Sequence, residues 1–420
     1  MNSIRLHINR LGLIRNSQVD IAPILLFSGE SGLGKSYVAI LCHYFFHVWL
    51  NTKRLSSFFL GKGIDFSNHD IPDQGIALSI KKTDLEEWLA IDAISYLRYM
   101  LGFEGLKADI SITLPQSVPD QLDFMYEREI IGVDSAEEIY NKLSVLGVRF
   151  RFKDLGLDDE NPYALILRYG MIQDIFGDYR GLATSYVLPP SRGSYLSESI
   201  SPNTGLWVSF IEGMKDLERA REIPDNVSQS LLELFQTVLD GEVRRESDKY
   251  VFITHGEEIP ISAAAASVRE AGALQLMVTK RDISKLALLI EEPEAHLHPL
   301  KQRMMADIIG TMALGNSYMQ ITTHSDYFLR RLNDLIRLHI LKNRMSDEEF
   351  RKLCDEHQFN PSLTLDPSKL AAYYLERGVD GFVTIRLQNS KHGVPFDTFE
   401  SINGKFMSDS TMLYDLVNDD

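Results

Sequence analysis

The stretch ILLFSGESGLGKS, residues 24–36, decides the fold expected for this chain of 420 residues. Its first part, Ile24 to Phe27, is a short apolar run that suits a buried strand. Its second part, Gly29 to Ser36, fits the pattern G-x-x-x-x-G-K-[ST] in full, and a helical run over residues 35–51 follows. The other interpretation is a chance glycine turn before a helix. The complete match between a strand and a helix favours a phosphate-binding loop.

The spacing of this loop has a chemical reason. Its glycines let the backbone wrap closely, so that N–H groups and the helix N-terminus face the phosphates of a nucleotide. Lys35 is expected to reach the β- and γ-phosphates, and the Ser36 hydroxyl is expected to ligate Mg²⁺. The predicted ligand is therefore ATP with Mg²⁺. The predicted contacts are Gly29, Glu30, Ser31, Gly32, Leu33, Gly34, Lys35 and Ser36.

A second segment, LALLIEEPEAHLHP (residues 286–299), reads as a buried strand that ends in carboxylates. In open α/β sheets ligands bind at the carboxyl ends of the strands. Glu291 is then expected near the metal, and Glu292 is expected to orient or deprotonate the attacking water. One alternative is an acidic helix start, which suits Glu294. The other, zinc binding by His296 and His298, is disfavoured because their spacing does not place both on one helix face.

A third segment, ITTHSDYFLRRL, places His324 just beyond a further apolar strand, residues 318–323. A histidine there can reach a γ-phosphate at the edge of the sheet. Taken alone, such a histidine is more often structural, but its order after the other two segments favours the site.

Composition sets broad limits. The net charge of −16 argues against a surface coated for nucleic acid or anionic membranes, although a local basic groove stays possible. Two cysteines indicate a reducing compartment, and neither a signal peptide nor an apolar run of transmembrane length is visible. We therefore expect a cytoplasmic protein without a membrane contact.

Strands and helices alternate around an expected parallel sheet that a long insertion divides. Residues 163–170 and 183–193 read as strands, residues 205–240 as helical, and residues 250–261 as a hairpin that turns at His255-Gly256. A capping box at Thr83 and Glu86 is expected to start another helix. The predicted units are 1–60, 61–245 (a largely helical insertion with a loop near 61–75), 246–335 and 336–420.

The order of these motifs resembles that of ABC-type ATPase heads, and more closely the OLD-like group, which is related to the heads of RecF and SMC proteins. The resemblance covers mainly residues 1–50 and 250–335, and the segments YVLPPSRG and DPSKLAAYYLERGVDGFVTIRLQNSKHGVPFD are also similar. It implies an α/β P-loop fold, with a mixed sheet and flanking helices.

The resemblance also implies roles. Lys35 and Ser36 match the Walker A pair, Glu291 the Walker B acid, Glu292 the catalytic glutamate and His324 the switch histidine. His298 falls at the D-loop position. Residues 259–272 stand where a signature segment meets the ATP of a second subunit, which makes ATP a dimerising ligand. Relatives carry Ser-Ser-Gly where this chain has Ala265, Ala266 and Ser267, so Ser267 is the remaining donor there. The other interpretation of this segment is a packed alanine-rich helix.

Some positions stay open. Gln74, Gln116 and Gln173 are candidates for a Q-loop glutamine, and Arg192 is either a phosphate or nucleic-acid contact or a structural arginine. Neither the Asp-x-Asp of a TOPRIM nuclease nor an HNH motif follows His324. By resemblance, such stand-alone ATPases occur in anti-phage systems such as PARIS and Septu, beside a separate TOPRIM- or HNH-type nuclease or a toxin.

Three functions follow from this sequence. The first is a slow ATPase that forms a homodimer or larger homo-oligomer and acts as sensor or scaffold in anti-phage defence, triggered by a phage protein or DNA. The second is a RecF/SMC-like DNA-repair ATPase. The third is an assembly subunit that binds ATP without turning it over.

Overall fold

The computed structural model describes residues 3–64, 75–133, 136–153, 161–178, 180–198, 200–220, 226–247, 249–388, 393–395 and 397–418. Gln74 and most of the loop predicted at 61–75 lie outside these described residues. None of the helices in this part of the chain combines the length and apolar character that a bilayer crossing requires.

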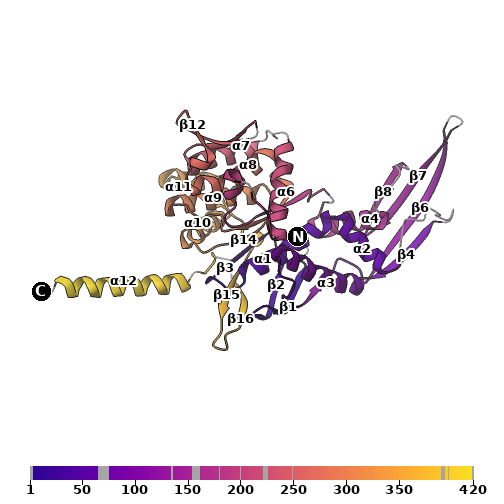
Figure 1. The fold of residues 1–420 in the computed structure, drawn as a ribbon, viewed down its shortest axis with the longest axis horizontal. Helices are drawn as coiled ribbons and strands as arrows, with labels where there is room; N and C mark the ends of the chain where they lie inside the picture. Colours follow the sequence, from indigo (N-terminus) through magenta and orange to yellow (C-terminus); the bar gives the residue numbers. More distant parts are fainter. Residues whose placement is uncertain are drawn as a thin grey trace.

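A nine-stranded sheet in the order β5-β1-β2-β16-β15-β3-β14-β13-β9 forms the centre of the molecule (Figure 1). The five strands from β15 to β9 run parallel, whereas β5, β1 and β2 pair in antiparallel fashion. The predicted mixed α/β fold is thus confirmed. The strands are β1 (Arg5–Leu11), β2 (Ile14–Asp20), β3 (Ile24–Gly29), β5 (Ala108–Thr113), β9 (Thr184–Leu188), β13 (Leu286–Glu291), β14 (Tyr318–Thr322), β15 (Leu370–Arg377) and β16 (Val383–Gln388).

Helices cover this sheet. The helix α1 (Lys35–His47) is almost wholly buried, because it packs on β3, β13, β14 and β9, and its apolar run has no polar face. The other helices of the body are α3 (Lys82–Leu101), α5 (Ser194–Ser197), α6 (Gly205–Arg219), α7 (Asn226–Leu239), α8 (Ala266–Lys280), α9 (Pro299–Leu314), α10 (Asp326–Lys342) and α11 (Asp347–His357). Single 3-10 turns occupy Val48–Leu50, Ile261–Ala263, Ile283–Lys285 and Pro367–Lys369.

The segment 61–245 holds helices, as predicted, and also a four-stranded antiparallel sheet. This sheet consists of β4 (Ile76–Lys81), β6 (Gln121–Val133), β7 (Ala136–Val145) and β8 (Val148–Lys153). The hairpin β6–β7 extends away from the body in Figure 1. Because β5 and β9 also come from this segment and join the main sheet, the segment is woven into the central fold.

Two local predictions were wrong. Residues 163–170, predicted as a strand, belong to the helix α4 (Pro162–Phe176), which packs between the helix α2 (Thr52–Gly61) and the strands β7 and β8. Because α4 is buried on two sides, its apolar residues do not follow the spacing of a one-sided helix. The signals that do mark the helix are Asn161, which caps it, and Pro162, which stands at its first position. The helix α3 begins at Lys82 without the predicted capping box, and Glu86 instead accepts a hydrogen bond from the Leu114 amide.

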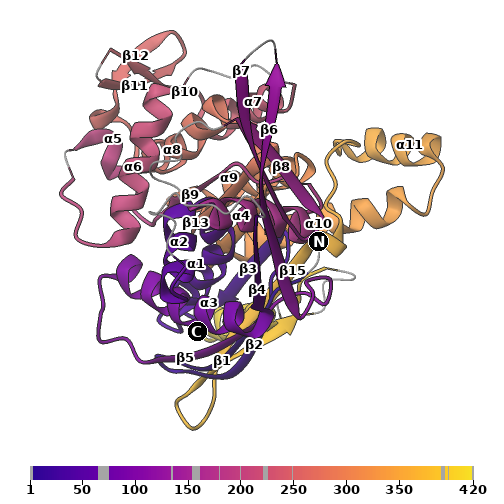
Figure 2. The ribbon, with the colours of Figure 1, turned by 90° about the vertical axis from the view of Figure 1, so that its right-hand side faces the viewer.

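The predicted hairpin at 250–261 is confirmed. Strands β11 (Lys249–Thr254) and β12 (Glu257–Pro260) pair beside β10 (Glu242–Glu246), and His255 and Gly256 have φ angles of 47° and 83° at the turn. Both this sheet and the hairpin β6–β7 lie above β1 and β2 in Figure 2, but Figure 1 shows them on opposite sides of the molecule. The last helix, α12 (Asp397–Asn418), projects from the body in Figure 1.

Candidate functional site

The phosphate loop joins β3 to α1 at the carboxyl edge of the parallel strands. Its glycines Gly29, Gly32 and Gly34 have φ angles of 131°, 76° and 95°, in the region that favours glycine. Gly34 is the N-cap of α1 and provides no side chain to cap it. The first amides of α1 are therefore free of a side-chain acceptor, as an anion site at a helix N-terminus requires.

The predicted loop contacts differ in orientation. Glu30, Ser31 and Gly32 are exposed, whereas the Leu33 side chain is buried in the core and anchors the loop. Only the backbone of Leu33 can therefore serve a nucleotide. Gly29 has no room for a side chain, because an added Cβ would lie 2.4 Å from the carbonyl oxygen of Leu375 on β15.

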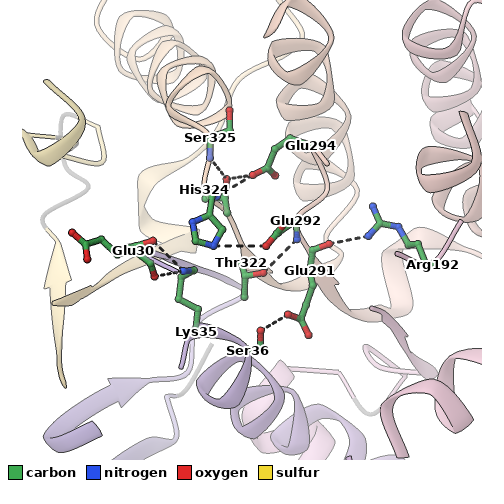
Figure 3. A network of polar contacts seen from close by, with 12 residues as sticks. Glu30, Lys35, Ser36, Arg192, Glu291, Glu292, Glu294, Thr322, His324 and Ser325 are labelled. Carbon is green, nitrogen blue, oxygen red and sulfur yellow. Dashed lines mark hydrogen bonds and ion pairs between the residues drawn. The ribbon is translucent and has the colours of Figure 1, made fainter. Parts of the chain in front are cut away.

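Lys35 holds the loop in shape from within. Its Nζ donates to the carbonyl oxygens of Gly29 at 3.0 Å and Glu30 at 2.7 Å, and the residue is only 6% exposed (Figure 3). Burial lowers the pKa of Lys35 to about 8, although Glu292 and Glu291 favour its charged form. Among the described residues, the hydrogen-bond partners of this ammonium group are carbonyl oxygens, which leaves its charge without a hydrogen-bonded carboxylate.

The acidic end of β13 meets the loop. The Ser36 hydroxyl donates a hydrogen bond to Oε2 of Glu291, which is 5% exposed. Burial raises the pKa of Glu291, against the effect of the Ser36 hydrogen bond. A hydroxyl and a carboxylate are hard oxygen donors that fit Mg²⁺, which takes few protein ligands beside phosphates and water. In the described part of the chain, no cluster of three or more His, Cys, Asp or Glu is placed to hold a metal ion.

Glu292 turns away from the strand. Its φ of 46° is left-handed, and its amide donates to the Thr322 carbonyl oxygen at 3.1 Å. This conformation, which costs about 1–2 kcal/mol for a residue with a Cβ, directs the carboxylate to the sheet edge. There its Oε1 lies 3.7 Å from Nε2 of His324, across the loop from Lys35 (Figure 3). Burial, followed by the charge of Lys35, lowers the pKa of His324, so the ring is mainly neutral near pH 7.

Glu294 has a different place from the predicted helix start. It is 5% exposed, and its Oε1 accepts hydrogen bonds from the Thr323 hydroxyl at 2.6 Å and the His324 amide at 3.0 Å. Burial raises the pKa of Glu294. The carboxylate thus fixes the loop that carries His324, and the macrodipole argument failed because the helix α9 starts only at Pro299.

The signature segment lies at the start of α8. Ala265 is the N-cap and gives no side-chain hydrogen bond, so the first amides there are also without a side-chain acceptor. Ser267 is half-buried, and among the described residues no hydrogen bond joins it to the phosphate loop. His298 is exposed and caps α9, where its Nδ1 accepts a hydrogen bond from the Leu300 amide at 3.4 Å.

Of the open positions, Arg192 lies behind the site, against the end of β13. It is fully buried, and its Nη1 donates to the carbonyl oxygen of Glu291 at 2.8 Å, so it is not an exposed nucleic-acid contact (Figure 3). Gln116 is an exposed loop residue, and Gln173 donates to the Gly177 carbonyl oxygen at the end of α4. Thr322 and Thr323 were not predicted as site residues, although both lie in the segment ITTHSDYFLRRL.

Residues 208–329 match the family model for the AAA ATPase domain. The matched part includes β13, Glu291, Glu292, Glu294 and His324, whereas the loop between β3 and α1 lies outside it. No match was found among curated proteins.

Solved SMC heads are similar to this chain. The SmcHead bound to the C-winged helix domain of ScpA has 12% identity, covers 92% of this chain and 97% of its own, and gives a TM-score of 0.39. The SMC head domain from Thermotoga maritima has 9% identity, 93% and 100% coverage, and a TM-score of 0.34. The Smc head domain with an extended coiled coil bound to the C-terminal domain of ScpA, derived from Pyrococcus furiosus, has 10% identity, 96% and 98% coverage, and a TM-score of 0.38.

Proposed function

We propose that this protein binds ATP with Mg²⁺ in the cradle between β3 and α1 and hydrolyses it slowly. The observation that carries the proposal is the hydrogen bond between Ser36 and Glu291, because it joins the phosphate loop to the acidic strand end. Two residues distant in sequence meet where a metal-bound phosphate would lie. Chance glycine turns do not explain this meeting.

The residues divide the chemistry among them. Ser36 and Glu291 would hold the metal, which when bound neutralises charge on the phosphates. Lys35 stabilises negative charge on the terminal phosphates, and the free amides of α1 bind the remaining oxygens. Glu292, which is more exposed than Glu291 and Glu294, accepts a hydrogen bond or a proton from the attacking water. Neutral His324 has a single N–H, which it donates either to this carboxylate or to the terminal phosphate.

Completion of the site requires a second copy of the chain. The start of α8 presents uncapped amides and the half-buried Ser267, and neither is bonded to the phosphate loop of its own chain. ATP held between two heads would thus stabilise a homodimer or a larger homo-oligomer. Because Ala265 and Ala266 supply no hydroxyl donors, we expect slow turnover, in the extreme that of an assembly subunit which binds ATP only.

The biological role that we propose is a cytoplasmic sensor or scaffold of bacterial anti-phage defence. Its support is the motif resemblance to OLD-like ATPases, and the two buried free cysteines, Cys42 and Cys354, agree with a reducing compartment. A separate TOPRIM- or HNH-type nuclease or a toxin would be the effector, and a phage protein or DNA the trigger.

The test is ATP binding, hydrolysis and molecular mass for the native protein, Lys35→Ala and Glu292→Gln. Lys35→Ala should bind ATP at least about tenfold more weakly, because it loses a charge-assisted contact to phosphate. Glu292→Gln should bind ATP, hydrolyse it far more slowly and accumulate as the larger species. Lys53→Ala, an exposed lysine on α2, is the matched control. Failure of the native protein to bind ATP would contradict the proposal.

The test also separates the assembly-subunit alternative. A single-turnover experiment measures whether bound ATP is cleaved at all, independently of product release. Cleavage by the native protein that Glu292→Gln abolishes supports the hydrolase. Bound ATP that stays intact in both supports the assembly subunit.

A DNA-binding role is the second candidate, and one observation favours it. A hollow of about 630 Å³ beside β1 and β5 is lined by four cationic residues in an otherwise acidic protein. They are Arg10, Arg15, Arg98 and Lys107. Arg10 and Arg15 are direct cross-strand partners, and like charges so placed repel each other. The Arg15 guanidinium donates to the carbonyl oxygens of Gly12 and Ile14 at 2.7 Å each, and Asp109 also lines the hollow. Binding of duplex DNA at low salt that Arg10→Glu and Lys107→Glu abolish would support this role.

A further inference from the structure

Arg192 stands at the junction between the acidic strand and the signature helix. It is 0% exposed, and three backbone carbonyl oxygens accept its hydrogen bonds. Nη1 donates to Glu291 at 2.8 Å and to Pro189 at 3.2 Å, and Nε donates to Glu270 at 3.0 Å. Glu291 ends β13 and Glu270 lies in the first turns of α8, so one guanidinium bridges both elements.

The backbone at Gly193, next to Arg192, approaches α8 closely. A Cβ on Gly193 would lie 2.8 Å from Cβ of Arg269 and 2.9 Å from the backbone nitrogen of Glu270, so only glycine lets this segment press on α8. The Gly193 amide donates to Oε1 of Glu270 at 3.2 Å. The contact is therefore made twice, by the guanidinium and by the backbone beside it.

Two polar atoms of this bridge, one on Arg192 and one on Glu270, have no hydrogen-bond partner among the described residues. Within the described residues, Nη2 of Arg192 and Oε2 of Glu270 are buried without a hydrogen-bond partner, and Nε and Oε2 are 3.9 Å apart. A buried arginine with a free N–H beside a buried carboxylate with a free oxygen can form a stronger pair after a small shift. Because Arg192 is bonded to the end of β13 and Glu270 belongs to α8, closing this pair would draw the two elements together.

We propose that Arg192 is a positioning residue that couples nucleotide occupancy to the placement of the signature helix. The path runs from Ser36 through Glu291 and Arg192 to Glu270 and the start of α8. Loading of the nucleotide site displaces the Ser36 hydroxyl from Glu291 and shifts the end of β13, and the guanidinium transmits this shift to the helix offered to a second copy. This inference rests on the proposed ATP site.

Two variants test the coupling. Glu270→Gln removes one charge but keeps an oxygen for the Gly193 amide. Arg192→Lys keeps the charge, but its single Nζ cannot replace donors that stand on two separate nitrogens, Nε toward Glu270 and Nη1 toward Glu291. Arg54→Lys is the matched control, because Arg54 is a partly buried arginine that pairs with Asp92 between α2 and α3, away from the site. The readouts are equilibrium ATP affinity, ATP-dependent association, and ATP-induced protection of residues 266–280 from amide hydrogen exchange in dilute, unassociated protein.

The expected result is a split between these readouts. ATP affinity should change less than about threefold in Glu270→Gln and Arg192→Lys, while ATP-dependent association should weaken about tenfold or more. Protection of residues 266–280 should disappear in both and persist in Arg54→Lys. If Arg192→Lys does not fold, Glu270→Gln decides alone.

Other outcomes overturn the inference. Unchanged protection and association in Glu270→Gln and Arg192→Lys, with or without a lower melting temperature, would make Arg192 a structural residue only. Loss of ATP affinity in parallel with association would place it in the binding site itself. A native protein that binds ATP no better than Lys35→Ala would remove the proposed function first, which distinguishes the two failures.

Discussion

Replacement of Gly29 by alanine tests how the phosphate loop is held. The added Cβ would lie 2.4 Å from the carbonyl oxygen of Leu375 and 3.3 Å from its backbone nitrogen. These are backbone atoms of β15, so no side chain can swing aside. A carbon needs about 3.3 Å from a carbonyl oxygen, so β15 must move by about 1 Å or the loop must distort.

The cost follows from these distances. The positive φ costs an alanine about 1–2 kcal/mol, and the displaced ladder loses one or two hydrogen bonds of about 1 kcal/mol each. We expect Gly29→Ala to lower the free energy of unfolding by about 2–4 kcal/mol. Gly32→Ala is the control, because Gly32 also has a positive φ but nothing within 4 Å of its added Cβ, and it should cost only about 1–2 kcal/mol.

Urea unfolding without nucleotide measures both values. The two variants should share the m-value of the native protein, because the surface exposed on unfolding is the same. Equal losses for Gly29→Ala and Gly32→Ala would refute the argument, since the contact with Leu375 would then have no energetic effect.

Three other predictions concern ionisable residues of the site and of the core. Because the pKa of Lys35 is about 8 and phosphate favours its charged form, ATP binding at pH 8 should take up about half a proton; calorimetry in buffers of different ionisation enthalpy should show this, and a binding enthalpy independent of the buffer would contradict it. Burial lowers the pKa of His43 to about 4, below its unfolded value, so the unfolded state binds more protons as the pH falls from about 6.5 to 4. Over this range His43 should remove about 2–3 kcal/mol of stability, and His43→Asn, which leaves an amide facing Gln320, should lessen the slope seen in urea titrations. Glu294→Gln keeps an acceptor for Thr323 and should preserve turnover. Glu294→Ala leaves the Thr323 hydroxyl and the His324 amide unpaired, so it should lower the free energy of unfolding by about 1–3 kcal/mol and also lower kcat. Equal kcat values in the two variants would exclude a role of Glu294 in holding His324.

The parallel core was predictable because its strands are buried on both faces. Runs such as ILLF and LALLI have no polar position. The first is followed by the glycine-rich loop and the second by the glutamates of the site. The same uniform burial hid α4, whose apolar residues meet partners on several sides. The long hairpin β6–β7 was missed although Leu122, Phe124 and Tyr126 alternate with polar residues.

Within the site, local sequence predicted which residues take part but not how they are held. The pairing of Ser36 with Glu291 needs β13 two strands from β3, and the strand order is not encoded in either motif. The burial of Glu294 depends on the loop after β14, and that of Arg192 depends on α8. These contacts are made by residues far apart in the chain, which is why three neighbouring glutamates came to have three different surroundings.

The position of β3 in the sheet also affects how the chain is made. Its two neighbours are β14 and β15, residues 318–322 and 370–377, so the strand that begins the phosphate loop has neither neighbour until most of the chain has left the ribosome. During synthesis the apolar residues of β3 therefore lack their neighbouring strands, and exposed strand edges of this kind promote aggregation. We expect nascent chains that stop before residue 370 to depend on chaperones and to form no nucleotide site, although residues 29–36 are complete in them.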